Sequence, residues 1–342
     1  MPSHVITDPG IPTLPEILDP VTMGTHLRQA LPTTGAAIQD IQPQLLKHHP
    51  GRRCTFEIAV RTVKGWEHLI GKVYAEDRSD VYRAMEEISR GGFGPEAEFA
   101  IPRPVVYLAP LRLLLYEKAI GTRAKVLILN PNRFDRVLPV ARCALWLARF
   151  HALGPRSGRV VCLDDQLRFL EDCWRGLADL GWPFADKASR LFERLNATAP
   201  RLGGIEMCAG HGRYSCGQVL LVEGRTVAFD WDTYRVTDPS CDVARTLIDF
   251  TRLGLKHFAS IRALDAVADV FLKAYTAAGR MVVATHLAFQ KAAICLERAK
   301  RDFEKDAREW AEAMLDEGLR ILKLALFYMA TDCSEWLVSL LT

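Results

Sequence analysis

The stretch from residue 208 to residue 245 constrains the fold and chemistry of this chain more than any other. Two short runs rich in β-branched and apolar residues, 218–222 and 226–229, are separated by a glutamate-glycine turn. Such runs on either side of a glycine are typical of a β-hairpin. The second run ends directly on Asp230, and Asp232 follows two residues later. Because side chains alternate between the faces of a strand, we expect both carboxylates on one side of the hairpin.

The hairpin predicts a metal site made only of oxygen ligands. Gln218 opens the first run and offers an amide oxygen, and Asp230 offers a carboxylate. Oxygen donors of this kind hold Mg²⁺ while it bridges phosphate groups. We therefore expect Gln218 and Asp230 to be metal ligands, with Asp232 as a further ligand or a substrate contact. The alternative is a capped hairpin end with solvated aspartates.

Three motifs in this stretch resemble those of a known family. They read H-G-x-x-x-x-G-Q-V-L-L from His211, F-D-W-D from Phe229 and D-P-S-C-D-V-A from Asp238. Together they are similar to motifs of the aminoglycoside phosphotransferase and choline-kinase group of small-molecule kinases, over about residues 40–320. The resemblance implies an α+β, two-lobed protein-kinase-like fold. It also implies ATP and Mg²⁺ as cofactors and a hydroxyl group of a small molecule as the phosphate acceptor.

The chain is expected to divide into three segments. Residues 1–34 form an N-terminal arm with a short helix, and the many prolines of residues 1–22 favour an extended arm. Residues 35–117 form the small lobe of antiparallel sheet and one helix, and residues 118–342 form a larger, mainly helical lobe. Within the small lobe the sequence predicts three successive strands and then a helix, at 44–48, 55–60, 68–74 and 79–90.

The small lobe contains the residues that the resemblance assigns to the nucleotide phosphates. The first turn of the sheet carries Gly51 and Arg53, which allow close backbone approach and offer positive charge; an ordinary solvated turn is the alternative. Lys72, in the third strand, resembles the lysine that binds the α- and β-phosphates. In the family an acid of the next helix orients this lysine. We expect Asp80 in that role, with Glu86 next and Glu87 as the third candidate.

An apolar strand, 113–117, is followed by a loop that ends at Gly121. This pattern resembles the segment that joins the two lobes of the family, where backbone groups bind the adenine ring. The resemblance therefore implies that the backbone near Glu117 and Ala119 binds adenine. A buried strand that simply leaves the sheet is the alternative.

Arg213 occupies the position at which the family carries its catalytic aspartate. A guanidinium only donates hydrogen bonds and stays protonated, so it cannot accept the proton of a substrate hydroxyl. Three hypotheses follow: Asp232 supplies the base, Arg213 binds a phosphate or an acidic substrate, or the chain is a nucleotide-binding pseudokinase. His211 resembles the residue that anchors this loop, and Asp242, at the start of the next helix, resembles a support for it.

Composition excludes several other classes of function. The 342 residues carry a net charge of +3, too small for a nucleic-acid or membrane electrostatic footprint. Nine cysteines without a C-x-x-C pair favour reduced thiols and a cytoplasmic location. No signal peptide or membrane span is expected. The acceptor, the choice between ATP and GTP and the oligomeric state stay open.

Overall fold

The computed structural model describes residues 6–31, 38–132, 134–179, 181, 184–279 and 284–331. The chain divides into two units. Unit 1 is Met1–Gly121 with Val227–Asp232, and unit 2 is Thr122–Thr226 with Thr233–Thr342. The segment Val227–Asp232 was predicted to belong to the lobe of residues 118–342, but it lies in unit 1.

Unit 1 is built on a five-stranded antiparallel sheet in the order β1-β2-β3-β6-β5. The strands are β1 Asp40–His49, β2 Arg53–Thr62, β3 Gly65–Tyr74, β6 Leu113–Glu117 and β5 Pro104–Leu108. The predicted succession of strands is confirmed, and each of the first three is longer than predicted. Pro43 lies within β1 and is tolerated there because β1 is an edge strand.

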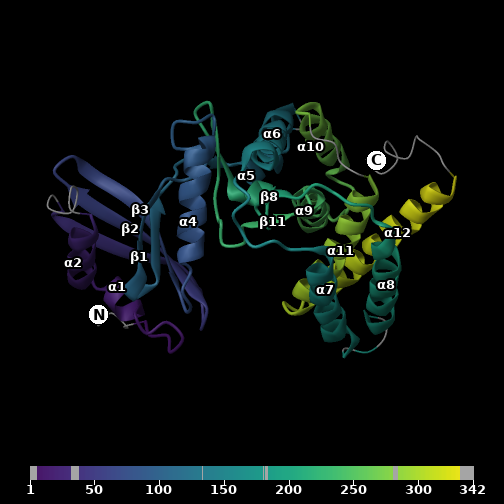
Figure 1. Ribbon diagram of the computed structural model, residues 1–342, viewed down its shortest axis with the longest axis horizontal. Coiled ribbons are helices and arrows are strands. Elements are labelled where there is room, and N and C mark those ends of the chain that lie inside the picture. Colours follow the sequence, from purple (N-terminus) through teal and green to yellow (C-terminus); the bar gives the residue numbers. More distant parts are fainter. Residues whose placement is uncertain are drawn as a thin grey trace. The chain divides into compact units, whose positions relative to one another are not determined.

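Helices pack on both faces of this sheet. The sheet lies between α2 Pro20–Ala30 and α4 Ser79–Ile88 (Figure 1). Alternate residues of β2 face the side covered by α2 and by α1 Leu14–Leu18, which explains the regular alternation of the β2 sequence. The buried side chains of this layer include Leu14, Ile17, Met23, Leu27, Cys54, Phe56, Ile58, Val60, Val73, Leu113 and Leu115.

The prediction of an extended arm over residues 1–22 is wrong from Leu14 onward. Pro15 and Pro20 lie in the first turns of α1 and α2, where a backbone N–H is not needed for the helix. Asp19 caps α2 by accepting a hydrogen bond from the amide of Thr22 at 2.7 Å. The prolines therefore start helices here instead of preventing them.

Unit 2 is mainly helical. Its helices are α5 Ala124–Ile128, α6 Val137–Leu153, α7 Leu163–Ala178, α8 Phe184–Thr198, α9 Ser240–Phe258, α10 Asp265–Ala277, α11 Ala284–Phe303 and α12 Arg308–Thr331. α11 packs against α7, α8, α9 and α12. The combination of a sheet unit and a larger helical unit confirms the α+β class.

The predicted hairpin is present as β9 Val219–Val222 and β10 Arg225–Ala228. Gln218 does not begin the first strand, because it ends the single 3₁₀ turn Cys216–Gln218. Two further short strands precede and follow the hairpin in the sequence, β8 Cys208–Gly210 and β11 Arg235–Thr237. They pair with each other in an antiparallel manner. Within the described part of the chain, no helix has the length and apolar character needed to span a membrane.

Candidate functional site

A buried cluster of charges surrounds Lys72 in unit 1. Lys72 is 5% exposed, and its ammonium donates hydrogen bonds to the carboxylate of Asp230 and, at 2.9 Å, to Asp232 Oδ1. The hydroxyl of Tyr74 donates to the same Asp232 oxygen at 2.9 Å, and the guanidinium of Arg53 pairs with Asp232. The structure therefore brings four of the predicted site residues together: Arg53, Lys72, Asp230 and Asp232.

Local structure explains why these side chains meet. Lys72 and Tyr74 are two residues apart on β3 and share one face, and Arg53 is the register partner of Tyr74 on β2. Tyr74 was not predicted as a site residue, although the two-residue period from Lys72 could have identified it. A buried ammonium is costly unless it is paired. Burial lowers the pKa of Lys72, and this effect exceeds the opposing effect of Asp230.

Asp230 and Asp232 lie in a turn after β10, and this turn directs both carboxylates to Lys72. The alternation of side chains along a strand, on which the prediction was based, does not apply to them. β10 ends at Ala228, and Asp230 has a φ of 76° in the left-handed region, which aspartate tolerates better than most residues. Trp231 lies between the two aspartates and is 1% exposed. Its indole N–H donates to the carbonyl oxygen of Ala228 at 3.3 Å, which fixes the turn.

The structure differs from the expected pairing of Lys72 with a helix acid. Asp80 accepts a hydrogen bond from Arg78 Nε at 2.9 Å, and its side chain is 61% exposed. Glu86 accepts from the hydroxyl of Tyr82 at 3.1 Å. Asp80 lies in the first turn of α4, two residues from Arg78, so its short side chain is engaged locally. A contribution of Asp80 to nucleotide binding stays a prediction.

The turn that contains Gly51 is attached to the N-terminal segment. Gly51 has a φ of 67°, and its amide donates to Asp8 Oδ2 at 2.9 Å. The other partners of Asp8 are the amide of Gly10 at 2.9 Å and His48 Nε2 at 2.7 Å. The backbone group predicted to face phosphate is thus bonded to a carboxylate. Asp8 was not predicted as a partner of this turn, although Asp-x-Gly is a recognisable turn signal.

The predicted adenine-binding segment begins at Glu117, the last residue of β6. The amide of Glu117 donates to the carbonyl oxygen of Arg103 at 2.9 Å, and its carboxylate pairs with the guanidinium of Arg103. The amide of Lys118 donates to the carbonyl oxygen of His68 at 3.0 Å. Regular pairing with the sheet therefore extends to Lys118, and Ala119 is the next residue. Adenine binding at Glu117 and Ala119 stays a prediction.

The loop that begins at His211 is held by Asp242 of α9. Asp242 Oδ2 accepts from the amide of His211 at 2.6 Å, and Oδ1 accepts from the amide of Gly212 at 2.9 Å. His151 Nε2 lies 3.6 Å from Asp242 Oδ2. Burial would raise the pKa of Asp242, but the interaction with His151 and nearby charges lower it to about 2. Asp242 is thus ionised and supports the loop, as the resemblance implied.

Arg213 is the third residue of this loop, and Gln218 lies at its far end. Gln218 Oε1 accepts a hydrogen bond from Ser215 Oγ at 2.6 Å, so an amide oxygen of the predicted metal-ligand type is fixed in place. Arg213 has no ion pair or side-chain hydrogen bond with any described residue. Burial, and then the charge of Arg301, lower the pKa of its guanidinium to about 10. At neutral pH the group therefore remains a cation and cannot act as a base.

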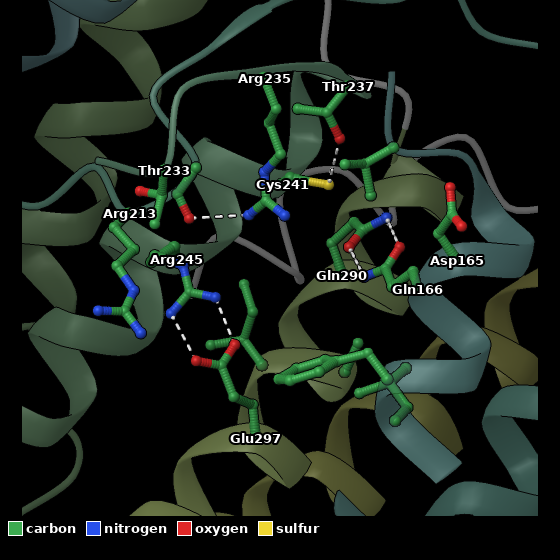
Figure 2. A pocket seen from close by; sticks show the side chains of 16 residues that line it. Asp165, Gln166, Arg213, Thr233, Arg235, Thr237, Cys241, Arg245, Gln290 and Glu297 are labelled. Atoms are coloured by element: carbon green, nitrogen blue, oxygen red, sulfur yellow. Dashed lines mark hydrogen bonds and ion pairs between the residues drawn. The ribbon is translucent and has the colours of Figure 1, made fainter. Parts of the chain in front are cut away.

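Arg213 lines two cavities of unit 2. The first, with a volume of about 230 Å³, is shown in Figure 2. Two pairs of residues form much of its polar lining. Gln166 and Gln290 exchange reciprocal amide hydrogen bonds, and Arg245 forms a two-bond ion pair with Glu297. These four polar side chains are thus paired with one another, whereas Arg213 in the same lining pairs with none of the described residues. The second cavity is larger, about 540 Å³, and includes Gln218.

Comparisons with known proteins agree with these features. The family model described as "Phosphotransferase enzyme family" matches residues 68–286. No curated protein sequence matches the chain. A choline kinase from Cryptosporidium parvum Iowa II has a TM-score of 0.65 at 9% identity, over 94% of this chain and 99% of that one.

Two further solved structures are similar to the chain. A choline/ethanolamine kinase family protein from Mesorhizobium loti has a TM-score of 0.60 at 13% identity, covering 88% of this chain and 94% of that one. An aminoglycoside phosphotransferase in ternary complex with AMP-PNP and hygromycin B has a TM-score of 0.61 at 15% identity, covering 88% and 98%. At these identities the similarities establish the fold, which is protein-kinase-like.

Proposed function

This chain belongs to the phosphotransferase enzyme family, and we propose that it transfers a phosphoryl group from ATP to a hydroxyl of a small molecule. The observation that carries the proposal is the Lys72 cluster. A buried lysine, a second cation at Arg53 and the acids Asp230 and Asp232 meet on one face of the sheet. Phosphoryl transfer depends on positioning and on neutralising charge, which is what this set of groups provides.

Each group has a proposed role. Lys72 and Arg53 bind phosphate oxygens of the nucleotide, which replace the carboxylates as partners of the two cations. Asp230 and Gln218 are candidate Mg²⁺ ligands, since both offer the oxygen donors that this ion prefers. The bound ion would neutralise part of the charge of the phosphates. Asp242 keeps the loop of Arg213 in place.

The transfer requires a base that accepts the proton of the substrate hydroxyl. The acceptor oxygen bonds to the γ-phosphorus while the bond from that phosphorus to the bridging oxygen breaks, and ADP leaves with the bridging oxygen. The hydroxyl proton must pass to a base, and Arg213 cannot accept it. Loss of a positioned general base typically lowers the rate by about 10² to 10⁴. Slow transfer is therefore our expectation for the natural chain.

A second candidate function is a nucleotide-binding pseudokinase. The observation in its favour is the cationic Arg213 at the base position, with Asp232 8% exposed and paired to Lys72 and Arg53. Under this hypothesis nucleotide binding persists without transfer. Phosphoryl transfer to a panel of hydroxyl compounds separates the two, measured for the natural chain and for Arg213→Asp. Phosphoryl transfer by the natural chain supports the phosphotransferase hypothesis, and transfer only by Arg213→Asp supports the pseudokinase hypothesis.

Nucleotide binding is tested by thermal unfolding with and without ATP and Mg²⁺. A ligand at about 100 times its Kd stabilises a folded protein by about 2.7 kcal/mol. We expect a clear rise in Tm for the natural chain and none for Asp230→Ala or Lys72→Ala. Asp186→Ala, on an exposed face of α8, is the matched control and should behave like the natural chain. Absence of a shift with every nucleoside triphosphate would contradict both candidate functions.

A further inference from the structure

The second cavity of unit 2 has an unusual charge. It is bordered by α5, the loop after Arg213, α9, the end of α11 and the start of α12. Seven of its lining residues are lysine or arginine, and two are aspartate. Its volume of about 540 Å³ lies within the usual range of small-molecule sites, about 300–1,000 Å³.

The two acids of the cavity are already paired. Asp249 accepts from Arg298 at 2.5 Å, and Asp302 accepts from Arg252 Nε at 3.0 Å in a two-bond ion pair. These pairs neutralise two of the seven cations, so the positive charge of the others is not balanced within the lining.

The remaining cations have few partners. Arg301 lies 3.9 Å from Glu297, whose carboxylate is bound more closely by Arg245 at 2.5 Å. The other side chains form no ion pair with any residue that the structure describes: Lys125, Arg213, Lys256 and Lys305. Cations that lack an acidic partner around a cavity favour the binding of an anion there.

The electrostatic environment supports this conclusion. Burial lowers the pKa of Lys125, and the nearby charge of Lys256 lowers it further. Burial and Arg301 have the same effect on Arg213, whose pKa falls to about 10. Each group thus lies among like charges in a partly desolvated place, where a bound anion would relieve the repulsion.

Helix geometry explains how the cations converge. On α9, Asp249, Arg252 and Lys256 follow a spacing of three and then four residues, which places them on one face. The same spacing relates Arg298, Arg301 and Lys305, at the end of α11 and in the following turn. α9 packs against α11, and the residues of both faces line the same cavity.

We propose that this cavity binds an anionic group of the phosphate acceptor. The acceptor is then a hydroxyl compound that carries a phosphate or carboxylate, and not a polyamine or quaternary amine, which the cavity would repel. This inference rests on the proposed function and specifies its substrate class. Arg213 and Gln218 border the same cavity, so the anion is held beside the loop assigned to the transfer. A guanidinium binds phosphate or carboxylate with two parallel hydrogen bonds, which gives Arg213 a role at this position.

The binding test uses pyrophosphate and citrate as anionic probes and choline and kanamycin as cationic ones, by calorimetry at low salt. The Lys72→Ala variant serves as the background, because it disables the proposed nucleotide-phosphate site of unit 1. We expect an anionic probe to bind this variant, and Lys305→Glu to weaken that binding at least tenfold. Lys273→Glu, on the exposed surface of α10, makes the same change in net charge outside the cavity and should leave the affinity within about twofold.

Three results would overturn the proposal: equal weakening by Lys305→Glu and Lys273→Glu, loss of anion binding in Lys72→Ala, or preferential binding of a cationic probe. Arg301→Glu, a second change in the cavity, repeats the test if Lys305→Glu does not fold. Failure of the proposed function is a separate result, since the ATP-dependent shift in Tm depends on Asp230 and Lys72 and not on Lys305. In a transfer assay, phosphorylated or carboxylated polyols should be phosphorylated in preference to kanamycin and choline.

Discussion

Replacement of Glu297 by glutamine should remove a large part of the stability of unit 2. Glu297 forms ion-pair hydrogen bonds with Arg245 at 2.5 Å and 3.3 Å (Figure 2), and its side chain is 12% exposed. Burial would raise the pKa of this carboxyl group, but Arg245 first and then Arg298 lower it from 4.5 to about 2. At about 1.36 kcal/mol for each pKa unit, this difference corresponds to roughly 3 kcal/mol.

The usual cost of breaking a buried ion pair by mutation agrees with the roughly 3 kcal/mol obtained from the pKa difference. Removing one member of a buried ion pair costs about 3–5 kcal/mol, because the other charge stays buried without its partner. We therefore expect Glu297→Gln to lower the free energy of unfolding at pH 7 by about 3 kcal/mol, measured by urea denaturation. The matched control is Glu206→Gln. Glu206 pairs with Arg156 at 2.8 Å, but its side chain is 76% exposed, and such pairs contribute about 0–1 kcal/mol.

The pH dependence gives a second check of the same pair. A carboxyl group whose pKa is lowered by folding stabilises the protein above its unfolded pKa, and this contribution is lost as pH falls through the folded value. For Glu297 the window runs from pH 4.5 down to about 2. The natural chain should lose more stability than Glu297→Gln across this range. A loss below 1 kcal/mol at pH 7, or parallel pH curves, would refute the reasoning.

Two further predictions concern single side chains. Gly212 has a φ of 79°, and an added Cβ would lie 2.2 Å from the carbonyl oxygen of Thr233. Gly212→Ala should therefore lower Tm, at a cost of about 1–3 kcal/mol. Gly203→Ala is the control and should leave Tm unchanged, because no atom lies within 4 Å of the added Cβ. Tyr74→Phe removes the hydrogen bond to Asp232 and should lower the free energy of unfolding, measured by urea denaturation, by about 1–3 kcal/mol. An unchanged free energy of unfolding would show that Lys72 and Arg53 satisfy Asp232 by themselves.

Local patterns in the sequence predicted most of the fold. The alternation of Phe56, Ile58 and Val60 identified β2, because one face of that strand is buried. The hairpin and its acids were also predictable, since both depend on neighbouring residues. The left-handed turn at Asp230 was not, because aspartate adopts such a φ only where tertiary contacts favour it.

Contacts between distant residues account for what the sequence did not show. The pairing of Arg53 with Asp232 joins residues far apart in the chain, and no local pattern indicates it. The repeated spacing of Arg298 and Arg301 on α11 was visible in the sequence. The sequence did not show that this spacing belongs to a cavity, because an exposed helix face carries charges at the same spacing. Only the packing of α11 on α9 shows that these cations border a cavity.

The attachment of Asp8 to Gly51 has a practical consequence for work with this protein. Asp8 accepts the hydrogen bond of the Gly51 amide, so an anion that binds at this turn would have to displace the Asp8 carboxylate. A purification tag joined close to Asp8, or a shortened chain that lacks it, would alter that competition. Affinities measured on such material would describe a different turn from the one in the untagged 342-residue chain.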